Sequence, residues 1–253
     1  MSEVKSAVRV LDILELFSVV SEPIGVSEIA RMMAIPKSSA QALLTTLVGR
    51  GYLIRAGSGY EMMGTYREDG WVGGALSRVL RFAEPMMQAL AQKTGESAFL
   101  SVLAPNFEMK YISKAVSPNV VRYDAPLASL RPAYCVSSGI AILAWLREAE
   151  IERFFKTVKL VPVTEHSPED ESTIRALLEK ARRLGYAELS NSNVPGASGV
   201  SAPVVDPTGH PLAALTLVGP TERFMKARVD LRNQVAEAAQ ELSRRIAPEK
   251  TKG

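Results

Sequence analysis

Apolar residues recur at spacings of three and four near the start of the chain, which is the period of an amphipathic helix. Val8, Leu11, Leu14 and Phe17 predict a first helix. A short second helix is predicted from Ser27, followed by a turn at residues 34–37 and a third helix from Ser38 to Val48. The buried stripe of that third helix would comprise Ala40, Leu43, Leu44, Leu47 and Val48. The order predicts a helix-turn-helix motif.

The opposite face of the third helix is small and polar, and Pro36 stands at its start. Such a face suits insertion into the major groove of DNA. Side chains of the right chemistry to read bases there are Lys37, Ser38, Gln41 and Ala42. Three more polar or basic side chains are expected to hold phosphates and thereby fix the register, namely Ser39, Thr45 and Arg55.

Local charge supports a DNA-binding surface. Residues 31–60 contain four basic residues and no Asp or Glu, although the whole chain carries a net charge of only +3. The alternative is a helical hairpin with no DNA role and a chance gap in acidic residues. A β-hairpin is predicted next, because residues 51–55 and 60–62 flank Gly57-Ser58-Gly59. A hairpin after such a helix is a wing, so residues 1–66 are predicted to form a winged helix-turn-helix domain.

A linker helix is predicted after the wing, within residues 67–84. Its apolar stripe runs from Leu76 to Ala83, and Pro85 is expected to break the helix and open another one over residues 85–94. An apolar stripe must be covered, either by a second copy of the chain or by the C-terminal domain of the same chain. We expect a homodimer or homotetramer, because DNA readers commonly dimerise to match two half-sites.

The pattern changes after residue 96, where short apolar runs alternate with amphipathic stretches and indicate an α+β domain over residues 85–248. Strands are predicted at 97–103, 109–113, 120–124, 186–190, 199–205 and 211–218. Helices are predicted at 138–147, 149–156, 168–184 and 222–246. Ser167 is the expected cap of the third of these helices, and Gly185 is its expected stop.

Composition excludes several classes of protein. No apolar run approaches the length needed to span a bilayer, and the N-terminus has no signal-peptide pattern. The single cysteine, Cys135, excludes an intrachain disulfide and a thiolate-rich zinc site, which fits a reducing cytoplasm. His166 and His210 do not stand at metal-ligand spacing, and His210 is expected to be a turn residue. Neither a metal nor a cofactor is predicted.

Several stretches, in order along nearly the whole chain, resemble the IclR family of bacterial transcription regulators. They are residues 6–14, 34–39, 44–47, 51–53, 137–144, 202–204 and Gly219-Pro220. The resemblance implies a winged helix-turn-helix, a linker helix and a GAF-like effector domain with an antiparallel sheet. It also implies dimers or tetramers on palindromic double-stranded operators, often as repressors and sometimes as activators, usually of an adjacent catabolic operon.

The resemblance further implies that a small organic acid binds at the start of the helix that follows Cys135. The residues expected there are Val136, Ser137, Ser138 and Gly139, and a helix N-terminus suits a carboxylate. Other family pocket positions correspond to Val120, Tyr123, Arg131, Leu189, Gly199, Thr216 and Val218.

Leu189, Ser192, Gly199 and Val218 depart from the family pattern by replacing polar groups with apolar or small ones, and Ile140 replaces a usual lysine or similar residue. We therefore expect a larger, less polar effector than glyoxylate, namely an aromatic or longer-chain carboxylate. Tyr123 would stack on it, and Arg131 or Arg122 would pair with its charge. The alternative for Tyr123 and Arg131 is a packing role.

Two other functions compete with a regulator. An enzyme acting on a small carboxylate could use Ser137, Ser138 or Cys135 as a nucleophile, but the chain has no nucleophile elbow, phosphate loop or dinucleotide fingerprint. The winged helix could instead dock another protein. We expect a regulator that is not an enzyme and has no catalytic residues.

Overall fold

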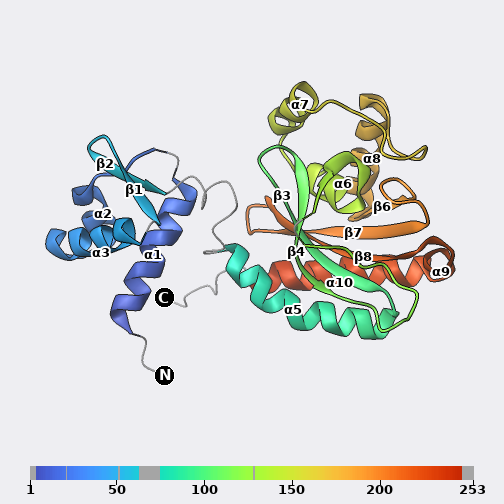
Figure 1. The fold of residues 1–253 in the computed structure, drawn as a ribbon, viewed down its shortest axis with the longest axis horizontal. Coiled ribbons are helices and arrows are strands. Elements are labelled where there is room, and N and C mark those ends of the chain that lie inside the picture. The colour runs from blue at the N-terminus through green and yellow to red at the C-terminus, as the bar shows by residue number, and fades with distance from the viewer. Residues whose placement is uncertain (1–3, 21, 51, 63–74, 128, 247–253) are drawn as a thin grey trace. The chain divides into compact units, whose positions relative to one another are not determined.

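The computed structural model describes residues 4–20, 22–50, 52–62, 75–127 and 129–246 (Figure 1). The chain divides into two compact units, residues 1–74 and residues 75–253. Residues 75–84 therefore belong to the C-terminal unit, whereas the sequence assigned them to a separate linker. The first part of the predicted linker helix lies outside the described residues.

The N-terminal unit is a winged helix-turn-helix, as predicted. It contains α1 (Lys5–Val19), α2 (Val26–Met32), α3 (Lys37–Gly49) and the antiparallel pair β1 (Leu53–Ala56) and β2 (Gly59–Met62). Its core consists of apolar side chains from all three helices and from the wing, including Ile13, Phe17, Ile29, Leu44 and Leu53. Leu11, which shares the predicted stripe of α1, is 55% exposed.

The C-terminal unit is built on an antiparallel six-stranded sheet with the order β5-β4-β3-β8-β7-β6. The strands are β3 (Ser97–Leu103), β4 (Glu108–Ala115), β5 (Leu130–Pro132), β6 (Ala187–Ser190), β7 (Ala197–Val205) and β8 (Pro211–Pro220). The helices are α5 (Ala75–Thr94), α6 (Ser137–Leu143), α7 (Glu148–Thr157), α8 (Glu171–Leu184), α9 (Thr221–Lys226) and α10 (Arg228–Ile246), with a 3-10 turn at Ala133–Cys135.

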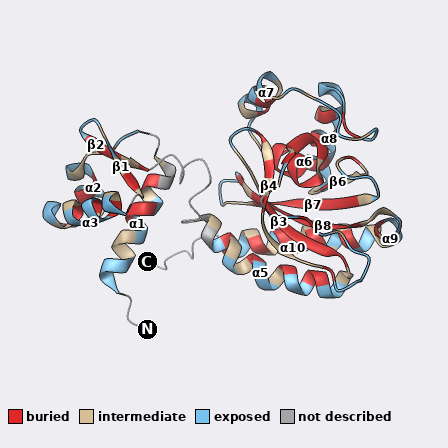
Figure 2. Cartoon of the chain, in the orientation of Figure 1, coloured by how far each residue is buried: buried red, intermediate tan, exposed pale blue. Residues whose placement is uncertain are grey.

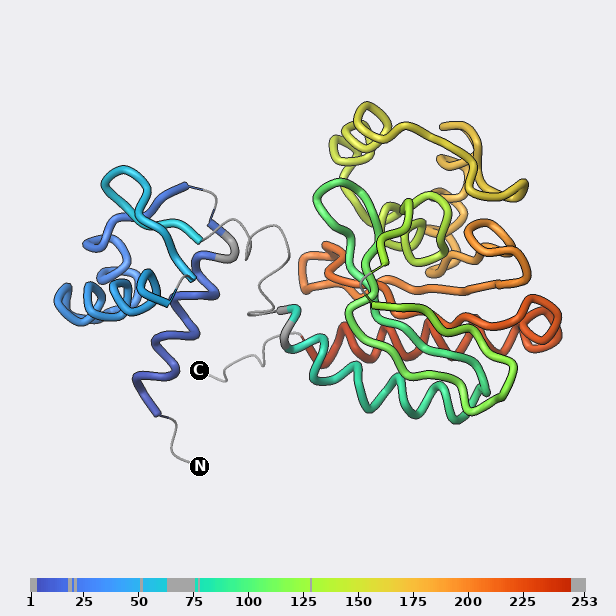
Figure 3. Tube along the Cα trace, viewed as in Figure 1, coloured from blue at the N-terminus to red at the C-terminus, as the bar shows by residue number. Residues whose placement is uncertain are grey.

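Helices cover both faces of this sheet, and its central strands are almost entirely buried (Figure 2). Alternate residues of β8 face opposite ways, so Leu215 and Leu217 pack with α5 and α10, whereas Ala214 packs with α6. The first and last helices of the unit, α5 and α10, lie side by side (Figure 3). This α+β architecture agrees with the sequence prediction.

Pro85 does not break the helix: α5 continues through it to Thr94. A proline removes one helical hydrogen bond, but Pro85 is exposed, as is Arg81, whose carbonyl loses that bond and faces the solvent side. Meanwhile Val79, Ala83 and Met87 stay fully buried in one core cluster. Most of the predicted stripe is thus covered by the chain's own C-terminal unit, and not by a second copy.

Other predicted elements differ in position. Residues 120–124 lie in a loop and not in a strand, and the short edge strand β5 was missed. The last predicted helix is divided into α9 and α10, with Val229 exposed. Asp170, and not Ser167, caps α8, because its carboxylate accepts from the Thr173 N–H at 2.8 Å. Gly185 ends α8 in the left-handed conformation, as predicted.

Strand β7 is longer than its neighbour β6, which pairs only with residues 198–201. Among the described strands, none pairs with the β6 side of residues 202–205. Along that edge Pro203 has no N–H, and the Val205 N–H is bonded to the Ser243 hydroxyl of α10 at 3.0 Å.

Among the described residues, no helix is long and apolar enough to cross a membrane.

Candidate functional site

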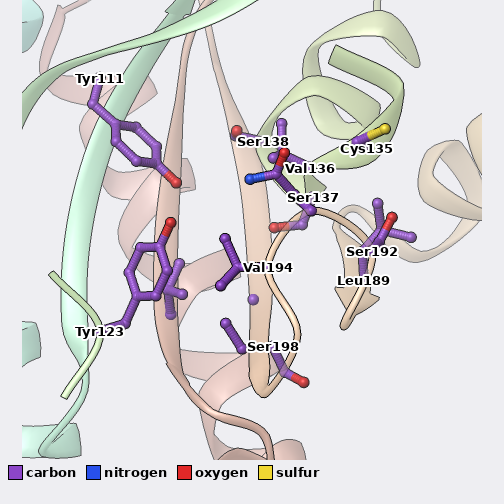
Figure 4. A pocket seen from close by; sticks show the side chains of 14 residues that line it. Tyr111, Tyr123, Cys135, Val136, Ser137, Ser138, Leu189, Ser192, Val194 and Ser198 are labelled. Atoms are coloured by element: carbon purple, nitrogen blue, oxygen red, sulfur yellow. The ribbon is translucent and has the colours of Figure 1, made fainter. Parts of the chain in front are cut away.

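A pocket opens in the C-terminal unit where the start of α6 meets β7, β8 and two loops (Figure 4). It has a cavity volume of about 40 Å³ and is partly open to solvent. Seven of its lining residues were predicted from the sequence: Tyr123, Val136, Ser137, Ser138, Leu189, Gly199 and Val218. Ser192, which the sequence showed as a departure from the family pattern, also lines it, and six further residues were not predicted: Tyr111, Cys135, Asn193, Val194, Ala197 and Ser198.

Two buried hydroxyls in this pocket have no hydrogen-bond partner. Ser138 is 1% exposed and Ser192 is 3% exposed, and the hydroxyl oxygen of each lacks a partner among the described residues. A buried polar group without a partner costs free energy, so such a group commonly marks a place where another molecule binds. Both hydroxyls come from the pocket wall, which makes the pocket the natural place for that molecule.

A third serine of the pocket, Ser137, is hydrogen-bonded to residues of the sheet. The Ser137 hydroxyl lies 2.8 Å from the Ser201 hydroxyl, which in turn lies 2.8 Å from the Thr216 hydroxyl. Thr216, predicted as a pocket residue, is therefore buried behind Ser201 and does not line the pocket. The first helical hydrogen bonds of α6 run from Gly139 and Ile140 to the Val136 carbonyl, so the two preceding N–H groups start the helix without such bonds.

Two tyrosines form the opposite wall, and Figure 4 shows their hydroxyls pointing toward one another. Tyr111 stacks on Phe99 with ring centroids 4.4 Å apart. Burial raises the pKa of Tyr111 well above its usual range, and the neighbouring Tyr123 adds to the rise. The Tyr111 hydroxyl consequently stays protonated at neutral pH and is engaged with the Tyr123 hydroxyl.

The predicted charge partners do not line this pocket. The Arg131 guanidinium lies over the Tyr111 ring, 4.3 Å from its centroid, and donates to the Ser129 carbonyl. Arg122 is exposed and donates to the Asn119 carbonyl. Arg131 thus has the packing role that was its alternative. The residues that line the pocket carry no charged side chain.

Two further predicted residues lie elsewhere. Val120 is 95% exposed in the loop after β4, because that loop forms no strand that would turn it inward. Gly139 lies on the buried side of α6, where an added Cβ would come 2.0 Å from the Ala133 carbonyl oxygen. Its role is close packing of the helix against the preceding turn.

Among the described residues there is no cluster of metal-ligating side chains. Within the same part of the chain, Ser137, Ser138 and Cys135 form no hydrogen bond with a histidine or a carboxylate.

The second candidate site is the exposed face of α3. Lys37, Ser38, Ala42 and Thr45 are exposed, and Ser39 is half-buried. Gln41 is also half-buried, because its amide donates to the Tyr60 hydroxyl of the wing at 2.8 Å. The Arg55 guanidinium lies 6.0 Å from the centroid of the Tyr60 ring. Tyr60 thus links the predicted recognition helix to the wing, a contact that the sequence pattern did not indicate.

Comparison with known proteins matches each of the two units to a known domain family. Residues 6–56 match the IclR helix-turn-helix domain, and residues 76–244 match the bacterial transcriptional regulator IclR C-terminal domain. The chain belongs to the IclR family.

Relatives of this IclR-family chain extend over its whole length. It is 29% identical to the HTH-type transcriptional regulator BhcR of Paracoccus denitrificans, over 97% of this chain and 88% of that protein. It is 26% identical to XynR of Escherichia coli, over 96% and 97% of the two chains. A crystal structure of a putative IclR-family regulator from Rhodococcus superposes with a TM-score of 0.66 at 27% identity, covering 96% of this chain and 94% of that one.

Membership in the family establishes the class of function. The chain is a DNA-binding transcription regulator, and the domains and relatives it matches are regulators and not enzymes. IclR regulators bind DNA and small-molecule effectors. The residues that contact DNA and effector in this chain remain predictions.

The Gln41–Tyr60 contact sharpens the prediction for base reading. Gln41→Ala is expected to cost roughly 1–3 kcal/mol of operator affinity at one base pair and to relax specificity there. Tyr60→Phe keeps Gln41 but removes its hydrogen bond to the wing, so it should weaken binding less and leave the base preference unchanged. Gel shifts on a set of single-base operator variants measure both. A uniform loss over all variants of the operator would show that Gln41 does not read a base.

Proposed function

We propose that an organic acid with an apolar body binds the pocket and controls operator binding. The observation that carries the proposal is the pair of unpaired, buried hydroxyls, Ser138 and Ser192, in one pocket. A carboxylate is an acceptor only, so hydroxyl donors without a partner are groups that it can bind. The proposal is supported further by the N–H groups at the start of α6.

The rest of the lining favours an apolar body. Val136, Leu189, Val194 and Val218 offer aliphatic surface, and Tyr123 offers a ring. Because the lining residues carry no charge, the carboxylate would be held by hydrogen bonds and not by an arginine, unlike the arrangement expected from the sequence. The pocket is partly open to solvent, and this apolar lining suits the body of an aromatic or longer-chain acid.

We further propose that the chain acts in the cytoplasm as a homodimer or homotetramer on a palindromic operator beside a catabolic operon. Two-fold symmetry in the operator would match two copies of the α3 face. The acid must bind one arrangement of the DNA-reading units better than another, with a coupling free energy of about 1–3 kcal/mol.

The effector class is tested by thermal shift with benzoate and glyoxylate. Benzoate is expected to raise the unfolding temperature of the C-terminal unit more than glyoxylate does. Ser138→Ala should weaken benzoate binding by about 10–100-fold, because a hydrogen bond to a charged group is lost. The same variant should unfold at the wild-type temperature or above it without ligand, since the Ser138 hydroxyl has no partner to lose.

Ser101→Ala provides the control, because Ser101 is buried on the same sheet but does not line the pocket. It should leave benzoate affinity unchanged. Stronger stabilisation by glyoxylate than by benzoate would contradict the proposed effector class. A gel shift with DNA from upstream of the chain's own gene, with and without benzoate, then tests whether the acid controls operator binding.

A further inference from the structure

The short helix α9 lies at the end of β8, next to two loops that wall the pocket (Figure 1). We call residues 191–196, between β6 and β7, the serine loop, because Ser192 belongs to it. We call residues 116–125, after β4, the tyrosine loop, because it carries Tyr123. Both loops supply pocket lining. Each of them is hydrogen-bonded to α9, through a different residue of that helix.

Thr221, the first residue of α9, is bonded to the serine loop. Its hydroxyl donates to the Asn191 side-chain oxygen at 3.2 Å, and its N–H donates to the Gly196 carbonyl at 2.8 Å. Because the one hydroxyl proton of Thr221 goes to Asn191, the Ser198 hydroxyl, 2.9 Å away, is the donor to Thr221. Ser198 lines the pocket, so this chain of bonds runs from the pocket wall to α9.

Arg223, two residues later, is bonded to the tyrosine loop. One of its terminal amino groups donates to the Val121 carbonyl at 3.0 Å. Two residues beyond Val121, the Tyr123 carbonyl accepts a hydrogen bond of 2.6 Å from the Ser97 hydroxyl at the start of β3. The backbone of the tyrosine loop is therefore hydrogen-bonded to α9 at Val121 and to β3 at Tyr123.

Arg223 also connects α9 to the end of α5. Its Nε and second terminal amino group form a bidentate pair with the Glu96 carboxylate, at 2.6 and 2.7 Å. Glu96 is 1% exposed and lies between α5 and β3, where its N–H donates to the Thr94 hydroxyl. Gly219 permits this pair, since a Cβ there would come 2.1 Å from a Glu96 oxygen.

We propose that α9 couples the effector pocket to α5, with Thr221 and Arg223 as positioning residues that touch neither effector nor DNA. The inference rests on the proposed function. A ligand that changes the spacing of the two loops must strain the bonds to α9, because the bidentate pair of Arg223 with the buried Glu96 carboxylate restricts how far that helix can move. α9 continues at Ala227 into α10, which packs against α5, and α5 is the element of this unit that follows the DNA-reading unit in the chain.

The coupling is tested first without any ligand, by hydrogen–deuterium exchange of the full chain. Thr221→Val removes only the hydroxyl and is expected to speed amide exchange by about tenfold in both loops, although Thr221 touches only the serine loop. The double variant Glu96→Gln/Arg223→Gln removes the ion pair without leaving a buried charge, and should likewise speed exchange in both loops. Faster exchange confined to the loop that each residue contacts would overturn the proposal.

Lys226→Gln is the matched control on the same helix, because Lys226 and its partner Glu222 are exposed at 74% and 87%. It should leave exchange in both loops unchanged. A second arm uses benzoate as the probe. Wild-type operator affinity should change by roughly 5–150-fold with benzoate. In Thr221→Val the change should fall below about twofold while benzoate affinity stays the same.

The two arms separate two failures. If benzoate does not bind the wild-type chain, the proposed effector class is wrong, and the exchange result still decides the role of α9. If benzoate binds and Thr221→Val keeps the full change in operator affinity, α9 does not couple the two sites.

Discussion

Replacing Gly139 by alanine is expected to lower the unfolding temperature of the C-terminal unit by about 6–12 °C. The added Cβ would lie 2.0 Å from the Ala133 carbonyl oxygen and 2.5 Å from two further backbone atoms, so no side chain can move aside to admit it. Overpacking of this kind lowers the free energy of unfolding by about 3 kcal/mol. In a unit of this size each kcal/mol lowers the unfolding temperature by roughly 2–4 °C. Calorimetry of the full chain measures the shift.

Gly199→Ala is the matched control in the same unit. There the tight contacts of the new Cβ would be with side-chain ends, the Ser137 hydroxyl at 3.1 Å and a Val218 methyl at 3.2 Å, while the Leu217 carbonyl oxygen at 3.5 Å would be in ordinary contact. We expect a shift of less than about 3 °C, together with weaker benzoate binding because the methyl group enters the pocket. Equal shifts for the two variants would mean that α6 is not held against the Ala133 turn as described.

Replacing Leu44 by alanine is expected to abolish operator binding by unfolding the N-terminal unit. Leu44 is fully buried between α1, α2 and the wing, and such a truncation costs about 2–5 kcal/mol. A domain of this size has a small core and little stability to lose. Gel shifts measure the loss of binding, and circular dichroism should show fewer folded helical residues at 25 °C.

The matched control is Thr46→Ala on the same helix. Thr46 is exposed, and its hydroxyl bonds only to the Ala42 carbonyl of the preceding turn. Operator affinity and helix content should change little, by about 0.5 kcal/mol at most. Benzoate binding should survive in both variants, since the C-terminal unit has its own core. Loss of benzoate binding in Leu44→Ala alone would contradict the independence of the two cores.

Regular elements with strong periodicity could be predicted from the sequence. The bounds predicted for β3 match those observed, and Gly185 was identified as the stop of α8, because each rests on a local preference. Pro85 misled the prediction because burial of Val79 and Met87 on either side outweighs one lost hydrogen bond. Residues 120–124 have the composition of a strand, but loop contacts to Gly95 and Arg223 decide their path.

The candidate pocket was predictable where its residues fall on family motifs, as at the start of α6. It was not predictable where tertiary contacts decide which side chains face inward. Tyr111 enters the pocket from the middle of β4, and nothing in its flanking residues distinguishes it from a core tyrosine. Arg131 was expected to meet the ligand charge, yet the face of the Tyr111 ring holds it outside the lining. Similarly, only the folded wing shows that Tyr60 holds Gln41.

The uncovered end of β7 bears on how the chain behaves at high concentration. A sheet edge with free N–H groups can recruit a strand from another molecule, which is a common start of aggregation. On this edge Pro203 offers no donor and Ser243 already occupies the Val205 N–H, so an incoming strand would find no donor at either position. The unpaired end of β7 is therefore poorly suited to extend the sheet with a strand from a second molecule.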